Sequence, residues 1–200
     1  RDAQESRGLG DVYKRQDLYM SKYEVVEKFV SINGEGTKAG QLAVFIRFKG
    51  CNLNCKYCDT KWANEQETPS QPMTEKEILD YVLSTGVKNV TLTGGEPLLR
   101  EGIENVITVL AENNLNIEIE TNGSVYLDKI RKLHKENVTF TMDYKLSCSG
   151  MEAAMNVDNF NILSSNDTVK FVAGCREDLI KAKQIIEKYN LYGKCNLYIS

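Results

Sequence analysis

The chain has 200 residues, of which 42% are apolar, so it can bury the core of one domain but hardly of two. Its formal charge of −3 provides no basic field, and its 25 Lys and Arg residues are spread along the chain, which argues against a nucleic-acid partner. No apolar run reaches the roughly 18 to 20 residues of a membrane-spanning helix, so we expect no membrane partner either.

The first 19 residues are polar and show no apolar period, so they would not fold by themselves. Back-translation of Ser6 to Gln16 resembles a transposon-end adaptor used in preparing sequencing libraries. We therefore predict that residues 1–19 are a non-native or disordered leader and that residues 20–200 form the domain. At the other end, Ser200 directly follows an apolar strand, so we expect that a closing element is missing there.

The predicted domain begins with an extended segment, Tyr23 to Ile32, that leads into Asn33-Gly34-Glu35-Gly36. Two glycines around a carboxylate let the backbone turn tightly and approach a ligand, although a plain hairpin turn fits the same residues. Ala43 to Phe48 is predicted to form a buried strand that contains Arg47. A guanidinium is expensive to bury unless it meets an anion, so Arg47 is either a substrate contact or half of a structural ion pair.

Beyond a polar linker from Ala63 to Pro72, helices and strands alternate, and a capping-box pattern at Thr74 to Glu77 opens the first helix. The predicted helices cover residues 75–83, 103–113, 127–135 and 177–189, and the predicted strands cover residues 89–93, 116–120, 139–143, 169–172 and 196–199. Strands that alternate with crossover helices imply a parallel sheet with right-handed connections. We therefore predict an α/β fold, a partial (β/α)6-type barrel, whose chemistry collects at the carboxyl ends of its strands.

Three cysteines directly follow the first barrel strand: Cys51, Cys55 and Cys58. A structural zinc site takes four ligands from the protein, whereas a cubane iron–sulfur cluster held by three thiolates keeps one iron open to another ligand. Spacing alone does not exclude a zinc site or a cluster of buried thiols in which Cys148, Cys175 or Cys195 supplies a further ligand. If they are not ligands, Cys148, Cys175 and Cys195 are interpreted as small packing residues. Six cysteines with three in one loop also indicate a reducing, cytoplasmic compartment rather than a disulfide framework.

The cysteine spacing, with Tyr57 before the last cysteine and Gly94-Gly95-Glu96-Pro97 one strand later, resembles the radical S-adenosylmethionine superfamily. The resemblance implies that the thiolates hold a 4Fe-4S cluster and that S-adenosylmethionine chelates the fourth iron. One-electron reduction, from a flavodoxin- or ferredoxin-type donor, then cleaves the cofactor to a 5'-deoxyadenosyl radical that takes a hydrogen atom from the substrate. No catalytic side chain beyond this cofactor-derived radical is implied.

Further segments narrow the resemblance to the 7-carboxy-7-deazaguanine synthase family. They are Asn33 to Gly36, Arg47, Cys58 to Thr60, Thr93 to Pro97, Glu120 to Gly123 and Asp143 to Lys145. The resemblance implies a lyase that converts 6-carboxy-5,6,7,8-tetrahydropterin to 7-carboxy-7-deazaguanine by radical ring contraction with loss of ammonia, in queuosine and related deazapurine biosynthesis. It also implies Mg2+, regeneration of S-adenosylmethionine and a homodimer.

The same resemblance assigns roles to residues at matching positions. Substrate contacts would come from Asn33, Gly34, Glu35, Gly36, Arg47 and Thr93, and cofactor contacts from Tyr57, Gly94, Gly95, Glu96, Glu120, Lys145 and Ser147. Arg47 would meet the substrate carboxylate, and Thr60 would ligate Mg2+ through its hydroxyl. The sequence departs from the family at Asn33, where the family more often has Gln, which is one methylene longer.

Two other functions share part of this pattern. An activating enzyme that installs a glycyl radical on a partner protein has the same cysteine spacing, the Gly-Gly-Glu-Pro segment and an Asp-x-Lys segment. The loop at residues 33–36, Arg47 and Thr60 instead favour a small anionic substrate with magnesium. A non-enzymatic zinc-binding module is the third alternative, and iron and sulfur content would exclude it.

Overall fold

The computed structural model describes residues 21–133 and 136–200. The predicted leader at residues 1–19, and the last residues of the helix predicted at 127–135, lie outside the described residues. The strands are β1 (Tyr23–Ile32), β2 (Leu42–Phe48), β3 (Gln71–Met73), β4 (Asn89–Gly94), β5 (Asn116–Thr121), β6 (Val138–Tyr144), β7 (Thr168–Phe171) and β8 (Asn196–Ile199). They form one eight-stranded sheet in the order β3-β1-β2-β4-β5-β6-β7-β8, with β3 and β8 at its edges.

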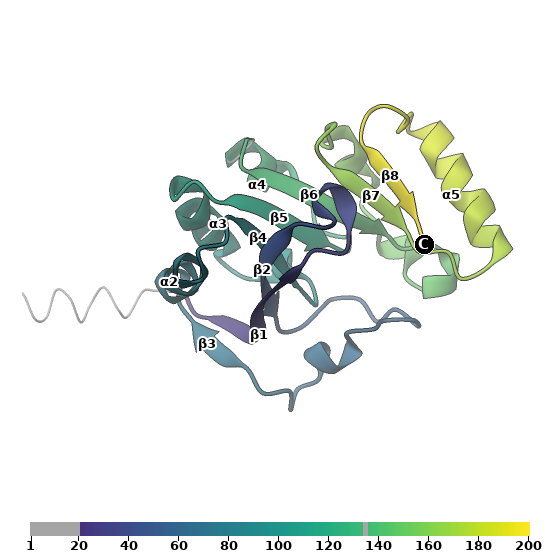
Figure 1. Ribbon diagram of the computed structural model, residues 1–200. Coiled ribbons are helices and arrows are strands. Elements are labelled where there is room, and N and C mark those ends of the chain that lie inside the picture. The colour runs from purple at the N-terminus through teal and green to yellow at the C-terminus, as the bar shows by residue number, and fades with distance from the viewer. Residues whose placement is uncertain (1–20, 134–135) are drawn as a thin grey trace, which may run out of the picture.

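From β2 to β8 every neighbouring pair in this order is parallel, whereas β1 pairs antiparallel with both β2 and β3. The helices are α2 (Glu75–Thr85), α3 (Ile103–Glu112), α4 (Asp128–Leu133) and α5 (Arg176–Lys188). Figure 1 shows them on the outside of a curved sheet that does not close on itself. The predicted α/β partial barrel of parallel strands is therefore confirmed.

The capping box predicted at the start of α2 is also confirmed. Thr74 Oγ1 accepts the N–H of Glu77 at 3.2 Å, and Glu77 Oε2 accepts the N–H of Thr74 at 2.8 Å. These two bonds satisfy N–H groups that have no partner within the helix. β3 was not predicted: it lies at the end of the expected polar linker, where Gln71 to Met73 pair with the first residues of β1.

Side chains alternate between two faces of the parallel strands. The outer face is apolar and packs in one core with the helices; it consists of Val44, Ile46, Val90, Leu92, Ile117, Ile119, Phe140, Met142, Val169 and Phe171. The inner face carries nearly all of the polar residues of these strands; it consists of Phe45, Arg47, Thr91, Thr93, Glu118, Glu120, Thr141, Asp143, Thr168 and Lys170. Burial of the outer face drives folding, and it leaves the inner face free for a ligand.

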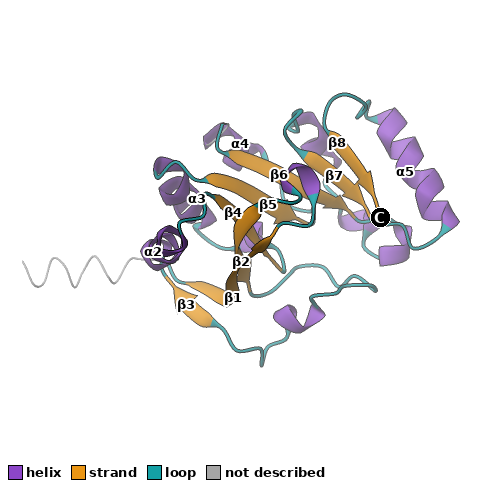
Figure 2. Ribbon diagram, in the orientation of Figure 1, coloured by secondary structure: helices purple, strands orange, loops and turns teal. Residues whose placement is uncertain are grey.

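The connections place further groups near the carboxyl ends of the strands. Between β2 and β3 the chain is mostly loop, interrupted by the short helix η2 (Lys61–Asn64), as Figure 2 shows. After β6 the weakly patterned segment contains the short helices η4 (Ser147–Ser149), η5 (Glu152–Ala154) and η6 (Val157–Asn161). None of the helices in the described ranges has the length and apolar content to span a lipid bilayer.

Candidate active site

A cavity of about 420 Å3 opens over the inner face. The inner-face residues that line it are Phe45, Arg47, Thr93, Glu120, Thr141, Asp143 and Lys170, and the loop after β2 contributes the three cysteines. Because β2 and β4 to β7 run in the same direction, the loops at their carboxyl ends meet above these side chains. The space has the size and the mixture of apolar and polar walls that are typical of small-molecule sites.

The cysteine loop, residues 51–60, brings all three thiols to this cavity. The N–H of Lys56 donates to the carbonyl of Ser149 at 3.0 Å, which fastens the loop to the segment after β6. Burial raises the pKa of the Cys55 thiol; the ammonium of Lys145 opposes that shift, and the neighbouring thiols of Cys58 and Cys51 add to it. A bound cation would reverse this balance, because metals bind the thiolate.

Polar groups surround two of the sulfurs. Cys51 Sγ accepts hydrogen bonds from the N–H of Leu53 and from Asn122 Nδ2, each at 3.4 Å. Cys58 Sγ lies 3.8 Å from Thr60 Oγ1. Hydrogen bonds to a sulfur stabilise its thiolate form and tune the reduction potential of a cluster that it holds.

The spacing of these sulfurs tests what they can hold. Zinc–sulfur bonds of about 2.3 Å keep two thiolates no more than about 4.6 Å apart. Within the described ranges, the one set of three Cys, His, Asp or Glu ligand atoms that all lie within 4.8 Å of one another is Cys148, Cys175 and Asp178. The thiols of the cysteine loop do not form such a set, and three thiolates on one loop are the donor set that would hold three irons of a cubane cluster and leave the fourth iron open.

The Gly-Gly-Glu-Pro segment ends β4 and packs directly against the start of the cysteine loop. The N–H of Gly95 donates to the carbonyl of Phe48 at 3.1 Å, and the N–H of Glu96 donates to that of Gly50 at 3.0 Å. A Cβ on Gly94 would lie 2.2 Å from the Phe48 oxygen, and a Cβ on Gly95 would lie 2.1 Å from the Gly50 oxygen. Both glycines are thus required for the two backbones to touch.

Glu96 is fully buried and connects the end of β4 to the end of β5. Its carboxylate accepts hydrogen bonds from the N–H of Leu98 at 3.1 Å, the hydroxyl of Thr121 at 3.0 Å and the N–H of Asn122 at 2.6 Å. Burial raises the pKa of Glu96 to about 7, and these donors oppose the shift. Through Asn122, this clamp positions a hydrogen-bond donor to the sulfur of Cys51.

The loop after β1 closes the cavity at the end opposite the cysteine loop. Asn33 is buried there: its Nδ2 donates to Glu118 Oε2 at 2.5 Å, and its Oδ1 accepts the N–H of Glu35 at 2.9 Å. Gly36 has a φ of +61°, and a Cβ on it would lie 2.9 Å from Thr141 Oγ1. The side-chain amide of Asn33 therefore holds the loop in place, and Glu35 is presented to the cavity.

Charged side chains form a continuous chain across the inner face. Lys145 Nζ lies 2.7 Å from Asp143 Oδ2, and Lys170 Nζ lies 3.1 Å from Asp143 Oδ1 and 2.5 Å from Glu35 Oε2. Burial disfavours the ammonium of Lys170, but Asp143 and Glu35 outweigh this and raise its pKa, so Lys170 stays charged. It ties the loop after β1 to β6 and β7.

Glu120 lies beside this chain on the inner face. Burial raises the pKa of Glu120 to about 7; the hydroxyl of Thr93 opposes the shift, Glu118 and Glu35 add to it, and Lys170 opposes it. A carboxyl group with a pKa near neutrality exchanges a proton at physiological pH, which is common at ligand-binding and catalytic sites.

Arg47 has one of the two roles expected from the sequence, and the other, contact with a substrate, stays a prediction. Its Nε donates to Glu27 Oε2 at 2.9 Å, which makes it half of a structural ion pair, and its side chain also lines the cavity. Beside it, the rings of Phe29 and Phe45 stack with centroids 5.2 Å apart and an interplanar angle of 9°. A cation next to a flat aromatic wall suits an anionic, planar ligand.

The cavity brings together most residues that the sequence singled out. Those that line it are Asn33, Gly34, Glu35, Arg47, Cys51, Cys55, Tyr57, Cys58, Thr60, Thr93, Gly94, Gly95, Glu120 and Lys145. Gly36, Glu96 and Ser147 do not: Gly36 packs against Thr141 and Glu118, Glu96 is the buried clamp, and Ser147 Oγ donates to Glu152 at 2.5 Å. Ligand contacts of these three, like those of the lining residues, stay predictions.

Sequence reasoning missed other lining residues, chiefly Lys170, Asn122, Phe29 and Phe45. A signal existed for Lys170, because it is the one charged residue between the apolar Val169 and Phe171 of a buried strand. Cys148 and Cys175, expected as packing residues, instead contact each other at a Sγ–Sγ distance of 2.7 Å, outside the residues that line the cavity.

Comparisons with known proteins agree with this geometry. Residues 45–145 match the Radical SAM superfamily. A 7-carboxy-7-deazaguanine synthase from Clostridium acetobutylicum is 59% identical over 179 residues, which cover 89% of this chain and 80% of that protein. One from Methanospirillum hungatei is 33% identical over 181 residues, which cover 90% and 73%. The crystal structure of QueE from Escherichia coli has a similar fold, with a TM-score of 0.68 at 23% identity over 83% of this chain and 78% of that one.

Proposed function

The chain belongs to the 7-carboxy-7-deazaguanine synthase family of the radical S-adenosylmethionine superfamily, and we propose that it converts 6-carboxy-5,6,7,8-tetrahydropterin to 7-carboxy-7-deazaguanine with loss of ammonia. One observation carries the proposal: the thiols of the cysteine loop and the charged residues of the inner face line the same cavity. A cluster-bound cofactor and a small anionic substrate would therefore meet in one space. The product would enter queuosine or related deazapurine biosynthesis.

We infer that Cys51, Cys55 and Cys58 hold a 4Fe-4S cluster and that S-adenosylmethionine binds at its open iron. When bound, these groups supply the radical that removes a hydrogen atom from the substrate. The proposed cofactor contacts that line the cavity with the thiols are Tyr57, Gly94, Gly95, Glu120 and Lys145. Glu96 would contribute indirectly, because it fixes Asn122 against the Cys51 sulfur.

The other side of the cavity is proposed to bind the pterin. The rings of Phe29 and Phe45 offer a flat surface to the heterocycle, and Glu35 offers a carboxylate to its N–H groups. Glu27 holds Arg47 by Nε, so that the terminal nitrogens of the guanidinium would pair with the substrate carboxylate. The proposed substrate site is completed by Thr93 and by the loop at residues 33–36, which the buried side chain of Asn33 holds in place.

Magnesium is a further proposal. Thr60 and its neighbour Asp59 both line the cavity, and hydroxyl and carboxylate oxygens are suitable ligands for this hard cation. The expected result is that Thr60→Ala raises the magnesium concentration needed for half-maximal turnover, while its iron content stays at the wild-type value. Turnover of the wild type that is unchanged by a magnesium chelator would contradict the proposal.

The proposed function is tested by an anaerobic assay of the reconstituted chain. The assay contains the carboxypterin, S-adenosylmethionine, magnesium and a low-potential reductant such as a flavodoxin or ferredoxin, and the product is identified by mass. We expect 7-carboxy-7-deazaguanine and recovery of S-adenosylmethionine. The Arg47→Met variant, which keeps an unbranched apolar side chain without the cation, should retain the cluster but bind the carboxypterin weakly.

The assay also separates the alternatives. Cleavage of S-adenosylmethionine without the deazaguanine would favour an enzyme that activates a glycyl-radical protein. A colourless protein that retains zinc in place of iron would favour a zinc-binding module. We further propose a homodimer in the cytoplasm, by likeness to the family and because the clustered thiols need a reducing compartment. Sedimentation at micromolar concentration tests the dimer.

A further inference from the structure

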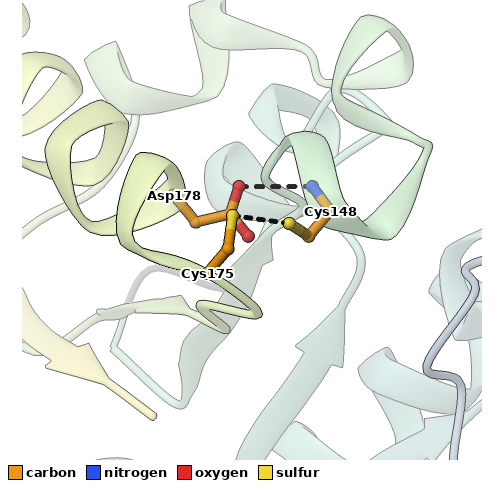
Figure 3. Close-up of side chains that lie close together, drawn as sticks. All are labelled: Cys148, Cys175 and Asp178. Atoms are coloured by element: carbon orange, nitrogen blue, oxygen red, sulfur yellow. Dashed lines mark hydrogen bonds between the residues drawn. The ribbon is translucent and has the colours of Figure 1, made fainter.

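A second group of metal-binding side chains lies outside the cavity lining, between the loops that follow β6 and β7. Figure 3 shows the sulfurs of Cys148 and Cys175 facing each other beside the carboxylate of Asp178. Cys148 lies in η4, Cys175 immediately precedes α5, and Asp178 lies in the first turn of α5. One ligand atom from each residue lies within 4.8 Å of the other two.

The two thiols are accessible to an ion from solvent, and the carboxylate is held in one orientation. Both cysteines are free thiols that are partly exposed, and their sulfurs are 2.7 Å apart, so an ion can reach them from solvent. Asp178 is buried, and its two oxygens accept the N–H of Cys148 at 3.2 Å and the N–H of Gly174 at 3.0 Å. Such backbone bonds fix a liganding carboxylate in the way that outer-shell partners do in metal sites.

We propose that Cys148, Cys175 and Asp178 bind a thiophilic divalent cation of the zinc class, at a site separate from the cluster of the cysteine loop. The two thiol protons would pass to solvent as the sulfurs bond to the ion, and a water molecule would complete four ligands. Metal–sulfur bonds of about 2.3 Å require the sulfurs to move apart by about 1 Å, which side-chain rotation of two partly exposed cysteines allows.

Asp178 is the reason to favour a cation over a disulfide between the same cysteines. A disulfide would use both sulfurs and would make no bond to the carboxylate beside them. Two thiolates and one carboxylate instead form the anionic ligand set that a divalent ion needs. The carboxylate is also held in place from both loops, because its two backbone donors belong to Cys148 and Gly174.

The site would join the two loops close to the cysteine loop. A Cβ on Gly174 would lie 2.9 Å from Cys148 Cβ, so the loops already touch. Ser149, next to Cys148, accepts the N–H of Lys56 from the cysteine loop. A cation bound by Cys148 and Cys175 would therefore stiffen the segment on which the cysteine loop rests, without contacting the substrate.

Alkylation of the cysteines tests the site in the unaltered chain. Trypsin places the relevant cysteines on separate peptides: Cys148 on residues 146–170, Cys175 on residues 171–176 and Cys195 on residues 195–200. The anaerobically purified, cluster-loaded protein is alkylated with iodoacetamide with and without added Zn2+, and the peptides are quantified by mass. We expect zinc to slow alkylation of Cys148 and Cys175 by about tenfold or more, with Cys195 unchanged.

Variants give an independent measurement. Zinc and iron are measured in the same cluster-loaded samples after dialysis against Zn2+ at fixed concentration. We expect Cys148→Ser and Asp178→Asn to weaken zinc binding by about tenfold or more with unchanged iron, and the control Cys195→Ser to bind as the wild type. Equal alkylation with and without zinc, zinc retained by Cys148→Ser, or a Cys148–Cys175 disulfide in the anaerobic protein would each overturn the proposal.

Discussion

The outer and inner faces of the parallel sheet are built from the same strands but serve opposite purposes. On β4, Leu92 is fully buried in the apolar core, while its neighbour Thr93 lines the cavity. On β7, Val169 and Lys170 divide in the same way. Adjacent residues of one strand therefore lie on opposite faces: one side chain stabilises the apolar core, and the next lines the cavity where ligands would bind. Stability and function should be separable between adjacent residues.

The two faces also differ in what makes the burial of their side chains favourable. The outer face is stabilised by removing apolar area from water. The inner face holds charges, and their burial is offset by the ion pairs among Glu35, Asp143, Lys145 and Lys170. The predictions below test this separation.

The largest effect is expected on the cavity side, at the cysteine loop. Cys55→Ala removes one of three thiols and should lower turnover by about a thousandfold or more, because the ligands of one cluster act as a unit. The measurement is iron per chain together with the anaerobic assay. Because Cys55 lies outside the main apolar core, far-ultraviolet circular dichroism should be unchanged. A variant with full iron content and turnover would refute the assignment.

On the outer face, Leu92→Ala should lower the free energy of unfolding by about 3 kcal/mol, because it leaves a cavity in the core. Urea unfolding under anaerobic conditions measures this change. Turnover per iron-loaded chain should stay within about twofold of the wild type, since the side chain points away from the ligand cavity. Lost turnover with unchanged stability would show that the two faces are not separable at this strand.

Glu96 predicts a dependence of stability on pH. Burial raises its pKa from 4.5 to about 7, so between these values the folded chain holds a proton that the unfolded chain releases. The stability from this group is present below pH 4.5 and is lost as the pH rises to about 7, by at most about 3 kcal/mol. The difference in unfolding free energy between wild type and Glu96→Gln should fall over this range. A constant difference would contradict the raised pKa.

At Lys170, the neighbour of Val169, we expect a smaller effect that is specific to binding. Lys170→Met removes the ammonium that pairs with Glu35 and Asp143, and should raise the KM for the carboxypterin by about tenfold. Lys170→Arg should restore part of the affinity, because it restores the charge. The matched control Val169→Ala should lower the free energy of unfolding and leave KM unchanged. Equal KM values for Lys170→Met and wild type would remove Lys170 from the site.

The smallest effect is expected for Thr93→Val. The hydroxyl of Thr93 lowers the pKa of Glu120, so its removal should raise that pKa further above its ordinary value. Because the charged carboxylate is the better acceptor for hydrogen-bond donors of the cofactor, the rise of S-adenosylmethionine affinity with pH should move to higher pH. Binding isotherms at a series of pH values measure this shift, and a shift to lower pH would refute the assignment.

Most of the fold followed from local signals in the sequence. The period of apolar residues located α5 at residues 177–189, against the observed Arg176–Lys188, and the capping box located the start of α2. β3 was missed because its three residues pair with a strand far away in the chain and carry no period of their own. Strand pairing of this kind depends on tertiary packing and leaves little local signal.

The candidate site also has features that local sequence predicts and features that depend on tertiary packing. The sequence by itself determined the cysteine triplet and the Gly-Gly-Glu-Pro segment at the end of β4, because each depends on spacing within one segment. Only the tertiary structure decided that Lys170 reaches Glu35, that Glu96 is a buried clamp rather than a cavity residue, and that Cys148 meets Cys175. These contacts join segments far apart in the chain, and their distances are set by how the strands and loops pack, which no local spacing encodes.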